Sequence, residues 1–492
     1  MIAPRAWPVR ARIQDAGVVP LAALGLAIAY AVALLVRGDN IVLLAPLLAA
    51  LVAVIVFVRP VAGVYLIFGT AILLEQFVIL GLNPITVGTH FYQNLSAYTE
   101  IPLRLSVADL LLLLTLAAWC AQVMRGKAHV TMGRFGWALA GYGGVFLLGV
   151  VIGVARGGFD ADAALAELRG PVLLCLVYLL SANCLRGRAA AQIVAWELVV
   201  LVGIKALQGI QNFIDGLSVP YDLEAVTGHE DVIFFDLIFA LALAAFVLRL
   251  RTRLAIALYA VTPLILTTLV LTERRVGFIA LGVSCIVVLL VTARLEPRRA
   301  LTFGAIGLAA AVIYGVTFWD ADGAIAQPIR AIRAIAEPSY VSVRDQMSDN
   351  WRVKEDLNIA NTIRQLPLTG VGVGQEYLVY TDPPPLPPAF TFWRFITHNA
   401  LLWLWLKAGV FGAFALWFLV ARVVTFGAST AARLRDVDLR WFALMPVCLV
   451  VAQIVFSAVE LGLSYSRTMI VLGTVLGLAS SLFPREPEAP SR

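Results

Sequence analysis

Four side chains that suit phosphate binding and proton transfer stand where apolar runs begin. Arg169 lies in "ELRGPVLLCLVYLL", Arg274 and Arg275 lie in "TERRVGFIALGVSC", and His398 lies in "THNALLWLWL". Arginine forks pair with phosphate oxygens, and a helix N-terminus presents unpaired N–H groups with a partial positive charge. We therefore expect an anion clamp beside a histidine, an arrangement that suits transfer from a diphosphate-activated donor.

The histidine is the candidate for proton chemistry. A helix N-terminus disfavours a protonated imidazole, so a neutral His398 could accept a proton as general base. Two plainer interpretations remain open. A histidine here can cap the helix or lie at a membrane interface, and an arginine at such an interface is more often a snorkelling anchor than a ligand.

The elements that must position these residues are membrane helices. The chain is 61% hydrophobic and 14% charged, with a mean hydropathy of +0.89, whereas soluble domains are about 45–50% apolar. Apolar segments long enough to span a membrane predict an all-α integral membrane protein, a polytopic bundle of about 12–14 transmembrane helices with one large extracytoplasmic loop. The predicted spans are 18–36, 41–58, 61–82, 105–124, 135–155, 168–184, 191–213, 233–249, 254–271, 276–293, 301–318, 397–420, 441–460 and 468–483.

The distribution of Lys and Arg over the short loops sets the expected orientation. Most of these residues fall in loops on the same side as the N-terminus, which predicts that both termini are cytoplasmic. The long loop then lies outside the cytoplasm, together with Arg169, Arg274, Arg275 and His398. We accordingly expect an N-terminal bundle over 1–318, the extracytoplasmic loop over 319–396, and C-terminal helices with a cytoplasmic tail over 397–492.

Charge and cysteine content exclude several other classes. The formal net charge of +6 reflects the orientation bias rather than a basic face on a soluble surface, so no nucleic-acid partner is expected. The five cysteines fall in or at the ends of predicted spans, which indicates no disulfide framework. No Cys and His spacing indicates a zinc site, and we expect neither a metal nor a cofactor.

The long outside loop has its own pattern. Residues 341–366 predict an amphipathic helix whose apolar face carries Trp351, Leu357, Ala360, Ile363 and Leu366. The "GVGVGQ" that follows lacks the Gly-Lys-Ser/Thr ending of a phosphate loop, so we expect a flexible turn. "TDPPPLPPAF" predicts a stiff segment that returns the chain to the membrane.

Charged residues in or near the spans allow two interpretations. Such residues often line a proton or ion path, but those near helix ends more often snorkel or form structural pairs. The residues concerned are Glu75, Lys205, Asp236, Lys407 and Glu460. His229 precedes another inward-going helix in "TGHEDVIFF", where it could contact a polar acceptor or cap the loop.

Two stretches together resemble the O-antigen ligase and polymerase superfamily of bacterial envelope glycan assembly. "SDNWRVKEDLNIANTIRQLPLTGVGVGQEY" contains an Arg and Glu pair, Arg352 and Glu355, followed by "PLTGVG". "THNALLWLWLKAGVFGAF" contains the His-Asn that opens a helix in this family. "TERRVGF" resembles the family's Ser-Arg-Gly motif, and "ELRG" resembles its earlier arginine.

The resemblance implies metal-independent glycosyl transfer at the outer face of the bacterial cytoplasmic membrane. The implied donor is a glycan on undecaprenyl diphosphate, and the acceptor is a hydroxyl on a glycan, lipid or protein. Carried over by position, Arg169 and Arg275 bind the diphosphate and His398 is the base. Arg274 is the alternative ligand, because "TERRV" replaces the usual motif. Possible acceptor or loop contacts are Asn399, His229, Arg352 and Glu355.

Two rival functions fit the sequence less well. A polysaccharide flippase or exporter has a similar number of helices, but it would have short loops on both sides and charges along a central cavity. A metal-dependent glycosyltransferase would carry acidic residues in its first outside loop, where this chain has only "RGDN". The concentration of polar residues in one outside loop favours the enzyme. Ligase and polymerase are not distinguished.

Overall fold

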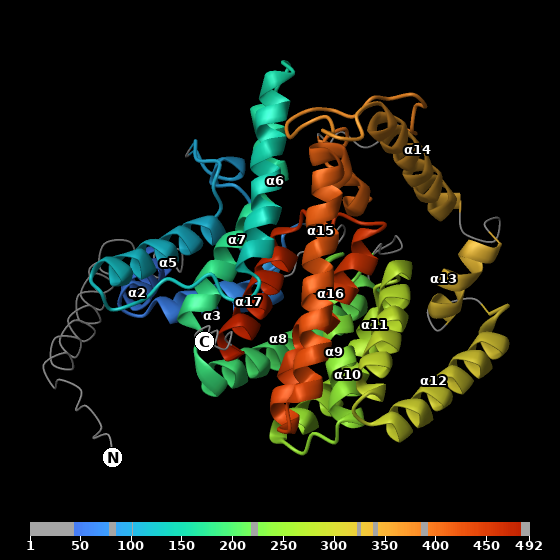
Figure 1. Ribbon diagram of the computed structural model, residues 1–492. Coiled ribbons are helices and arrows are strands. Elements are labelled where there is room, and N and C mark those ends of the chain that lie inside the picture. The colour runs from blue at the N-terminus through green and yellow to red at the C-terminus, as the bar shows by residue number, and fades with distance from the viewer. Residues whose placement is uncertain are drawn as a thin grey trace, which may run out of the picture. The chain divides into compact units, whose positions relative to one another are not determined.

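The computed structural model describes residues 44–77, 85–100, 102–217, 225–321, 326–337, 343–384 and 392–483 (Figure 1). These residues form helices and connecting loops, and they contain no β-strand. The chain divides into two compact units, one of residues 1–67 and 94–130 and the other of residues 68–93 and 131–492. The predicted span 18–36 and most of the proline-rich segment lie outside the described residues.

The smaller unit contains two paired helices. It holds α2 (Leu44–Val58), the start of α3 (Pro60–Leu73), the short η2 (Leu95–Ala97) and α5 (Val107–Met124). Ser106 and Asp109 form a capping box that fixes the start of α5. The Gln122 side chain donates to the Val58 carbonyl at 3.3 Å, which joins the ends of α5 and α2.

The larger unit contains the rest of the membrane helices. They are α6 (Gly136–Ala155), α7 (Ala161–Cys184), α8 (Gly187–Gly216), α9 (Asp231–Val247), α10 (Arg253–Leu271), α11 (Arg275–Ala293), α12 (Pro297–Phe318), α15 (Ala400–Arg433), α16 (Val437–Ser457) and α17 (Ser466–Leu482). A short α4 (Ile85–Gly88) precedes them. Each span predicted from residue 105 onwards is therefore a helix.

Nine helices of the described residues are long and apolar enough to cross a membrane, and α2, α3 and α17 are shorter apolar helices. The predicted fold class, an all-α polytopic membrane protein, is confirmed. The packing is tightest between α7 and α17, where small residues allow close approach. A Cβ at Gly473 would lie 2.9 Å from the Leu174 carbonyl oxygen. By contrast, α12 buries only Ala300, and it leaves the neighbouring helices along most of its length (Figure 1).

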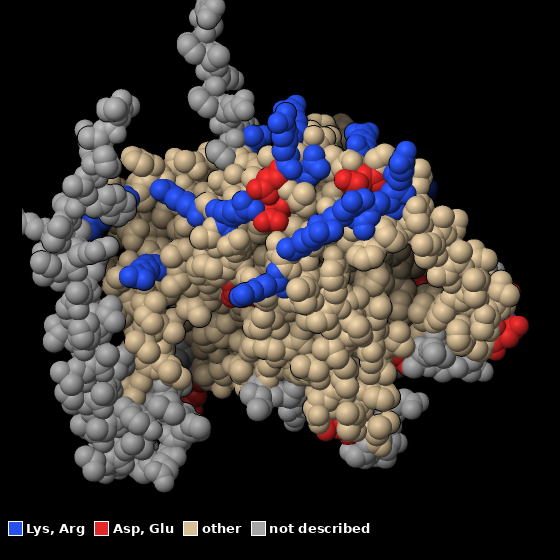
Figure 2. Space-filling view, turned by 90° about the horizontal axis from the view of Figure 1, so that it is seen from below, with Lys and Arg blue, Asp and Glu red and all other residues tan. Residues whose placement is uncertain are grey.

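Basic residues gather at one end of these helices, on the face seen in Figure 2. Two contacts show that several loops meet at this end. Arg188 at the start of α8 pairs with Asp436 before α16 at 3.0 Å, and Arg299 in α12 donates to the Val247 carbonyl of α9 at 2.8 Å. The positive-inside rule predicts that this end is cytoplasmic.

The loop between α12 and α15 contains two helices. The sequence pattern did not indicate α13 (Gln327–Ala336), but it did indicate α14 (Val343–Gln365). The predicted apolar face of α14 is wrong in one respect, because Leu357 is 51% exposed. Polar Asn358 and Thr362 are buried instead, since their side chains bond the backbone of residues 378–381.

The "GVGVGQ" segment is buried rather than a flexible turn, so that expectation was wrong. The Val371 amide donates to the Leu406 carbonyl at 2.6 Å, and the Val373 amide donates to Gly149 of α6 at 2.9 Å. α15 breaks at Ala408 and Gly409, where Gly409 has φ 62°. A Cβ at Gly409 would lie 2.0 Å from the Leu368 carbonyl oxygen, so the close approach requires glycine.

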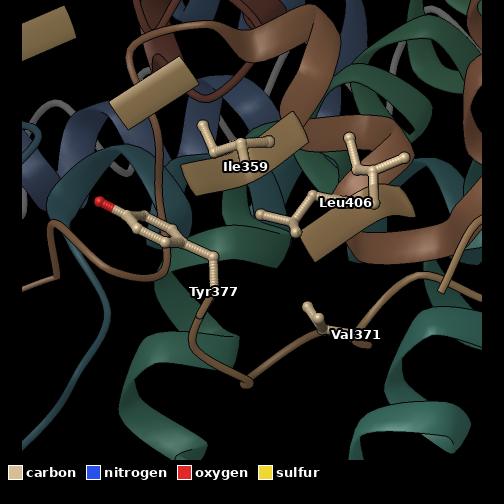
Figure 3. Close-up of a cluster of buried hydrophobic side chains, with 5 residues drawn as sticks. Ile359, Val371, Tyr377 and Leu406 are labelled. Carbon is tan, nitrogen blue, oxygen red and sulfur yellow. The ribbon is translucent and has the colours of Figure 1, made fainter. Parts of the chain in front are cut away.

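A buried apolar cluster joins α14 and this segment to α15 (Figure 3). It consists of Ile359, Ile363, Val371, Tyr377 and Leu406. A buried ion pair lies next to this cluster. The Lys407 ammonium pairs with Glu167 of α7 at 2.6 Å, and both side chains are fully buried. Glu167 also accepts the Gly374 amide at 2.6 Å. The start of α15 is thereby fixed in place by α14 and by the segment that follows it.

Candidate active site

His398 precedes Asn399, the N-cap of α15, and is held by a buried carboxylate of α14. Glu355 Oε2 accepts hydrogen bonds from the His398 backbone N–H at 3.0 Å and from its Nδ1 at 3.2 Å. Glu355 is fully buried, while the His398 side chain is 22% exposed. The Trp351 ring packs edge-on against the imidazole with centroids 4.9 Å apart. The ring is thus oriented through Nδ1, and Nε2 is the nitrogen left for proton transfer.

The adjacent residues repeat this pairing. Asn399 caps α15 by accepting the Leu402 amide at 3.1 Å, and its Nδ2 faces Asp356 Oδ2 at 3.4 Å. Burial, with the nearby Glu355 charge, raises the pKa of Asp356 to about 6, against the opposing effect of Asn399. Two consecutive residues of α14 therefore face two consecutive residues at the start of α15, and a second carboxylate lies beside the histidine.

A further carboxylate, Glu460, lies in the connection between α16 and α17. Its Oε1 pairs with Arg352 of α14 at 2.7 Å, and its side chain is 6% exposed. Burial opposes its ionisation, but the pKa of Glu460 is lowered, chiefly by the Arg352 guanidinium and also by that of Arg274. Glu460 is therefore an anionic centre of a cluster that gathers residues from five separate parts of the chain. This His398 cluster consists of His229, Arg274, Arg352, Glu355, His398 and Glu460.

The two consecutive arginines before α11 have different partners. Glu273 has φ 54°, a left-handed conformation that is uncommon outside glycine and often marks a functional site. After this turn Arg274, the N-cap of α11, contacts Nε2 of His229. Arg275 instead forms a bidentate pair with Asp349 of α14 at 3.0 and 2.9 Å. Arg274 thus belongs to the His398 cluster, while Arg275 fastens α14 to α11.

The expectation that Arg169 opens a helix was wrong. α7 begins at Ala161 with Asp160 as N-cap, so Arg169 lies well inside the helix and beyond the reach of its N-terminal dipole. The polar start of α7 hid this, because Asp162 and Glu167 interrupt the apolar run. A Cβ at the next residue, Gly170, would lie 3.0 Å from the carbonyl oxygens of Leu463 and Ser464, so Arg169 is close to the Glu460 connection.

The site contains two residues that sequence reasoning missed. Asp356 carries no motif signal of its own, and Glu460 was interpreted as a snorkelling or structural residue. Its pairing with Arg352 could not be found from the sequence, since 108 residues separate the two. Asn399, His229, Arg352 and Glu355, expected as contacts, all lie in or beside the cluster.

This arrangement can perform acid–base chemistry on a bound anion. An imidazole backed by a buried carboxylate can take a proton, because the carboxylate stabilises the imidazolium that forms. Cationic Arg274 and Arg352 lie in the same cluster and can stabilise negative charge on a leaving group. Within the described ranges, no three His, Cys, Asp or Glu residues are placed to hold a metal ion.

The helices and the site together define a polytopic membrane protein with a histidine–carboxylate pair at the mouth of its bundle. The family model described as O-antigen ligase matches residues 260–418, from α10 into the second half of α15. Residues 260–418 are therefore similar to the O-antigen ligase family, and the resemblance inferred from the sequence is confirmed for this segment. The matched segment includes Arg274, Arg275, Glu355 and His398. No curated protein gives a significant match to the chain.

Proposed function

We propose that this protein transfers a glycan from undecaprenyl diphosphate to an acceptor hydroxyl at the extracytoplasmic face of the bacterial cytoplasmic membrane. The O-antigen ligase match over residues 260–418 supports a membrane protein of the glycan ligase and polymerase kind. The observation that carries the specific proposal is the Glu355–His398 pair beside the Arg274 and Arg352 charges.

In the proposed reaction the acceptor oxygen attacks the anomeric carbon of the donor sugar. His398 Nε2 takes the acceptor proton, and the imidazolium is stabilised by Glu355. The bond between the anomeric carbon and the diphosphate oxygen breaks, and undecaprenyl diphosphate leaves with the electron pair. Arg274, Arg169 and Arg352 are the proposed sources of positive charge for the diphosphate. The chemistry of this step calls for no metal.

The pairing of Arg275 changes the assignment that the resemblance implied. The Arg275 guanidinium already binds the Asp349 carboxylate in the bidentate geometry in which it would bind a phosphate. Arg274 instead contacts His229 in the His398 cluster. We therefore assign the diphosphate contact to Arg274 and the docking of α14 to Arg275. The buried ionic tether between Lys407 and Glu167 keeps α15 and α7 in register near Arg169.

Reconstitution with a defined lipid-linked donor tests this function. His398→Ala should lower turnover by roughly 10²–10⁴-fold while donor binding is retained. Purified protein in proteoliposomes would be given a radiolabelled undecaprenyl diphosphate glycan and separate glycan, lipid and peptide acceptors. Glycan transfer at the wild-type rate by well-folded His398→Ala would refute the role of the base. Transport of the donor without any transfer would favour a flippase.

The proposed orientation has its own test. Cysteines at Asp382 and Ala432, each introduced singly into a cysteine-free background, should react differently with an impermeant thiol reagent. Asp382 lies in the outside loop and should react in intact spheroplasts, whereas Ala432 should react only after lysis. The opposite pattern would place the site on the cytoplasmic face and exclude an extracytoplasmic reaction.

A further inference from the structure

The short segment before α9 is held firmly from three directions. Asn212 of α8 donates to the Val226 carbonyl at 2.8 Å, and the Thr227 hydroxyl meets the Thr272 hydroxyl at 3.2 Å. Glu230 pairs with Arg467 of α17 at 2.8 Å, with both side chains buried. His229 lies between these anchor points, so its backbone is fixed relative to α10 and to the turn that carries Arg274.

The contact between His229 and Arg274 determines which ring nitrogen carries the proton. A guanidinium has only donors, so His229 Nε2 must accept and the proton of the neutral ring must sit on Nδ1. Burial, together with the Arg274 charge, lowers the pKa of His229 to about 4. The ring is therefore neutral at physiological pH, and it can accept from Arg274 throughout that range.

We propose that His229 is the positioning residue that aims Arg274 at the donor diphosphate. An arginine at the first turn of a helix has many rotamers, and ordering them costs conformational entropy when a ligand binds. His229 belongs to a segment that Asn212, Thr272 and Arg467 hold in place, so its contact orders the Arg274 side chain before the lipid-linked glycan binds. A guanidinium has five N–H donors, so Arg274 can donate to His229 and still donate to phosphate oxygens. This role rests on the proposed function of the same site.

Two isosteric substitutions separate this role from the alternatives. The amide oxygen of His229→Gln can reach the position of Nε2 and accept from Arg274, whereas the shorter His229→Asn places its amide near Nδ1. His229→Asn should raise the dissociation constant for undecaprenyl diphosphate at least tenfold, and His229→Gln should recover most of that loss. The effect should fall on the KM for donor much more than on turnover at saturation.

The experiment uses the full-length protein in nanodiscs, with undecaprenyl diphosphate as the binding probe. In an Arg274→Ala background, His229→Asn should cause no additional loss, because its effect passes through that arginine. Equal affinities for the Gln and Asn variants would overturn the proposal. Tighter binding of undecaprenyl diphosphate by His229→Asn than by His229→Gln would also overturn it, because that result would indicate direct contact through the Nδ1 position. Additive losses of affinity in the double variant with Arg274→Ala would overturn it as well. Failure of the wild type to transfer glycan would instead count against the proposed function.

Discussion

Two groups of charged residues lie close together in the larger unit, and they differ in how far solvent reaches them. The first, the Arg467 network, comprises Arg467, Glu230, Asp231, Lys205 and Glu75, and each member is at most 5% exposed. Arg467 pairs with two carboxylates and donates to the Ala71 and Ile72 carbonyls. The second is the His398 cluster, in which the side chains of His398 and Arg352 are 22% and 28% exposed while those of Glu355 and Glu460 are buried.

The difference separates structural charge from functional charge. An ion pair that is buried inside the protein gives rigidity but is out of reach of a substrate. The His398 cluster keeps exposed donors and acceptors, and its positions are fixed by contacts to α14 and to the Arg467 network. Glu230 and His229 are adjacent, so the network ends where the site begins. Substitutions in the two groups should therefore fail in different ways.

The largest effect should follow from breaking the Arg467 network. Arg467→Met leaves Glu230 and Asp231 buried without their partner, and removal of one member of a buried pair typically costs about 3–5 kcal/mol. We expect the variant to be lost from the membrane or to unfold at a much lower temperature in detergent. Thermal unfolding of purified protein measures this, with His398→Ala as the matched control that should stay folded. Equal unfolding temperatures for Arg467→Met and the wild type would remove the distinction between the groups.

The next effect concerns the carboxylate behind the base. Glu355→Gln keeps the shape but removes the charge that stabilises the imidazolium, so turnover should fall by about 10²-fold. The unfolding temperature should change little, in contrast to Arg467→Met. Initial rates at saturating donor and acceptor provide the measurement. A wild-type rate for this variant would mean that Glu355 only caps the backbone at His398.

A smaller effect is expected at the pair between Arg275 and Asp349. Their side chains are 23% and 42% exposed, so the pair should contribute only about 1 kcal/mol. Asp349→Asn should loosen α14 and lower turnover by roughly two- to fivefold, an effect that high salt should mimic in the wild type. Donor affinity should not change. Tighter donor binding by Asp349→Asn would show that Arg275, rather than Arg274, takes the diphosphate.

The smallest effect is a pH dependence of stability at Asp356. Its pKa is raised to about 6 in the folded protein from an ordinary value of 3.8, so the folded state binds a proton more tightly than the unfolded state. Its stabilising contribution is complete below about pH 4 and is lost as pH rises through about 6. Solvent screening limits this to about 1 kcal/mol. Unfolding temperatures of Asp356→Asn should lack this change between pH 4 and 7, and an unaltered profile would exclude Asp356 as its source.

The sequence was sufficient to place most of the membrane helices but not the contacts between them. Periodicity and hydropathy placed the ends of α5, α6, α10 and α11 within a few residues, because apolar length is a local property. The start of α7 was misplaced because the charged Glu167 interrupts the apolar run. Glu167 can be buried in the helix only through its ion pair with Lys407, which lies far along the chain. The carry-over of motifs located Arg274, Arg275 and His398, but it could not tell which arginine faces the histidine. That depends on the backbone turn at Glu273.

The GVGVGQ segment shows the same limit. Its glycines were interpreted as flexibility, yet Gly372 has φ 98° and a Cβ there would lie 2.4 Å from the Gly153 nitrogen. Close packing of backbone on backbone requires glycine as surely as a loose turn does. Only the position of α6, set by residues far earlier in the chain, distinguishes the two cases.

The break in α15 has a consequence for how the protein is assembled. At the break the Leu406 carbonyl accepts from Val371, and the Val410 amide donates to Pro367, so segment 367–371 satisfies backbone groups that the helix cannot. Exposed to lipid alone, those groups would be costly. During synthesis, α15 should therefore enter the bilayer as one continuous helix. It should bend only when segment 367–371, which is synthesised earlier, packs against it. Maturation of the site would then be a late, post-insertion event, separate from translocation of the helices.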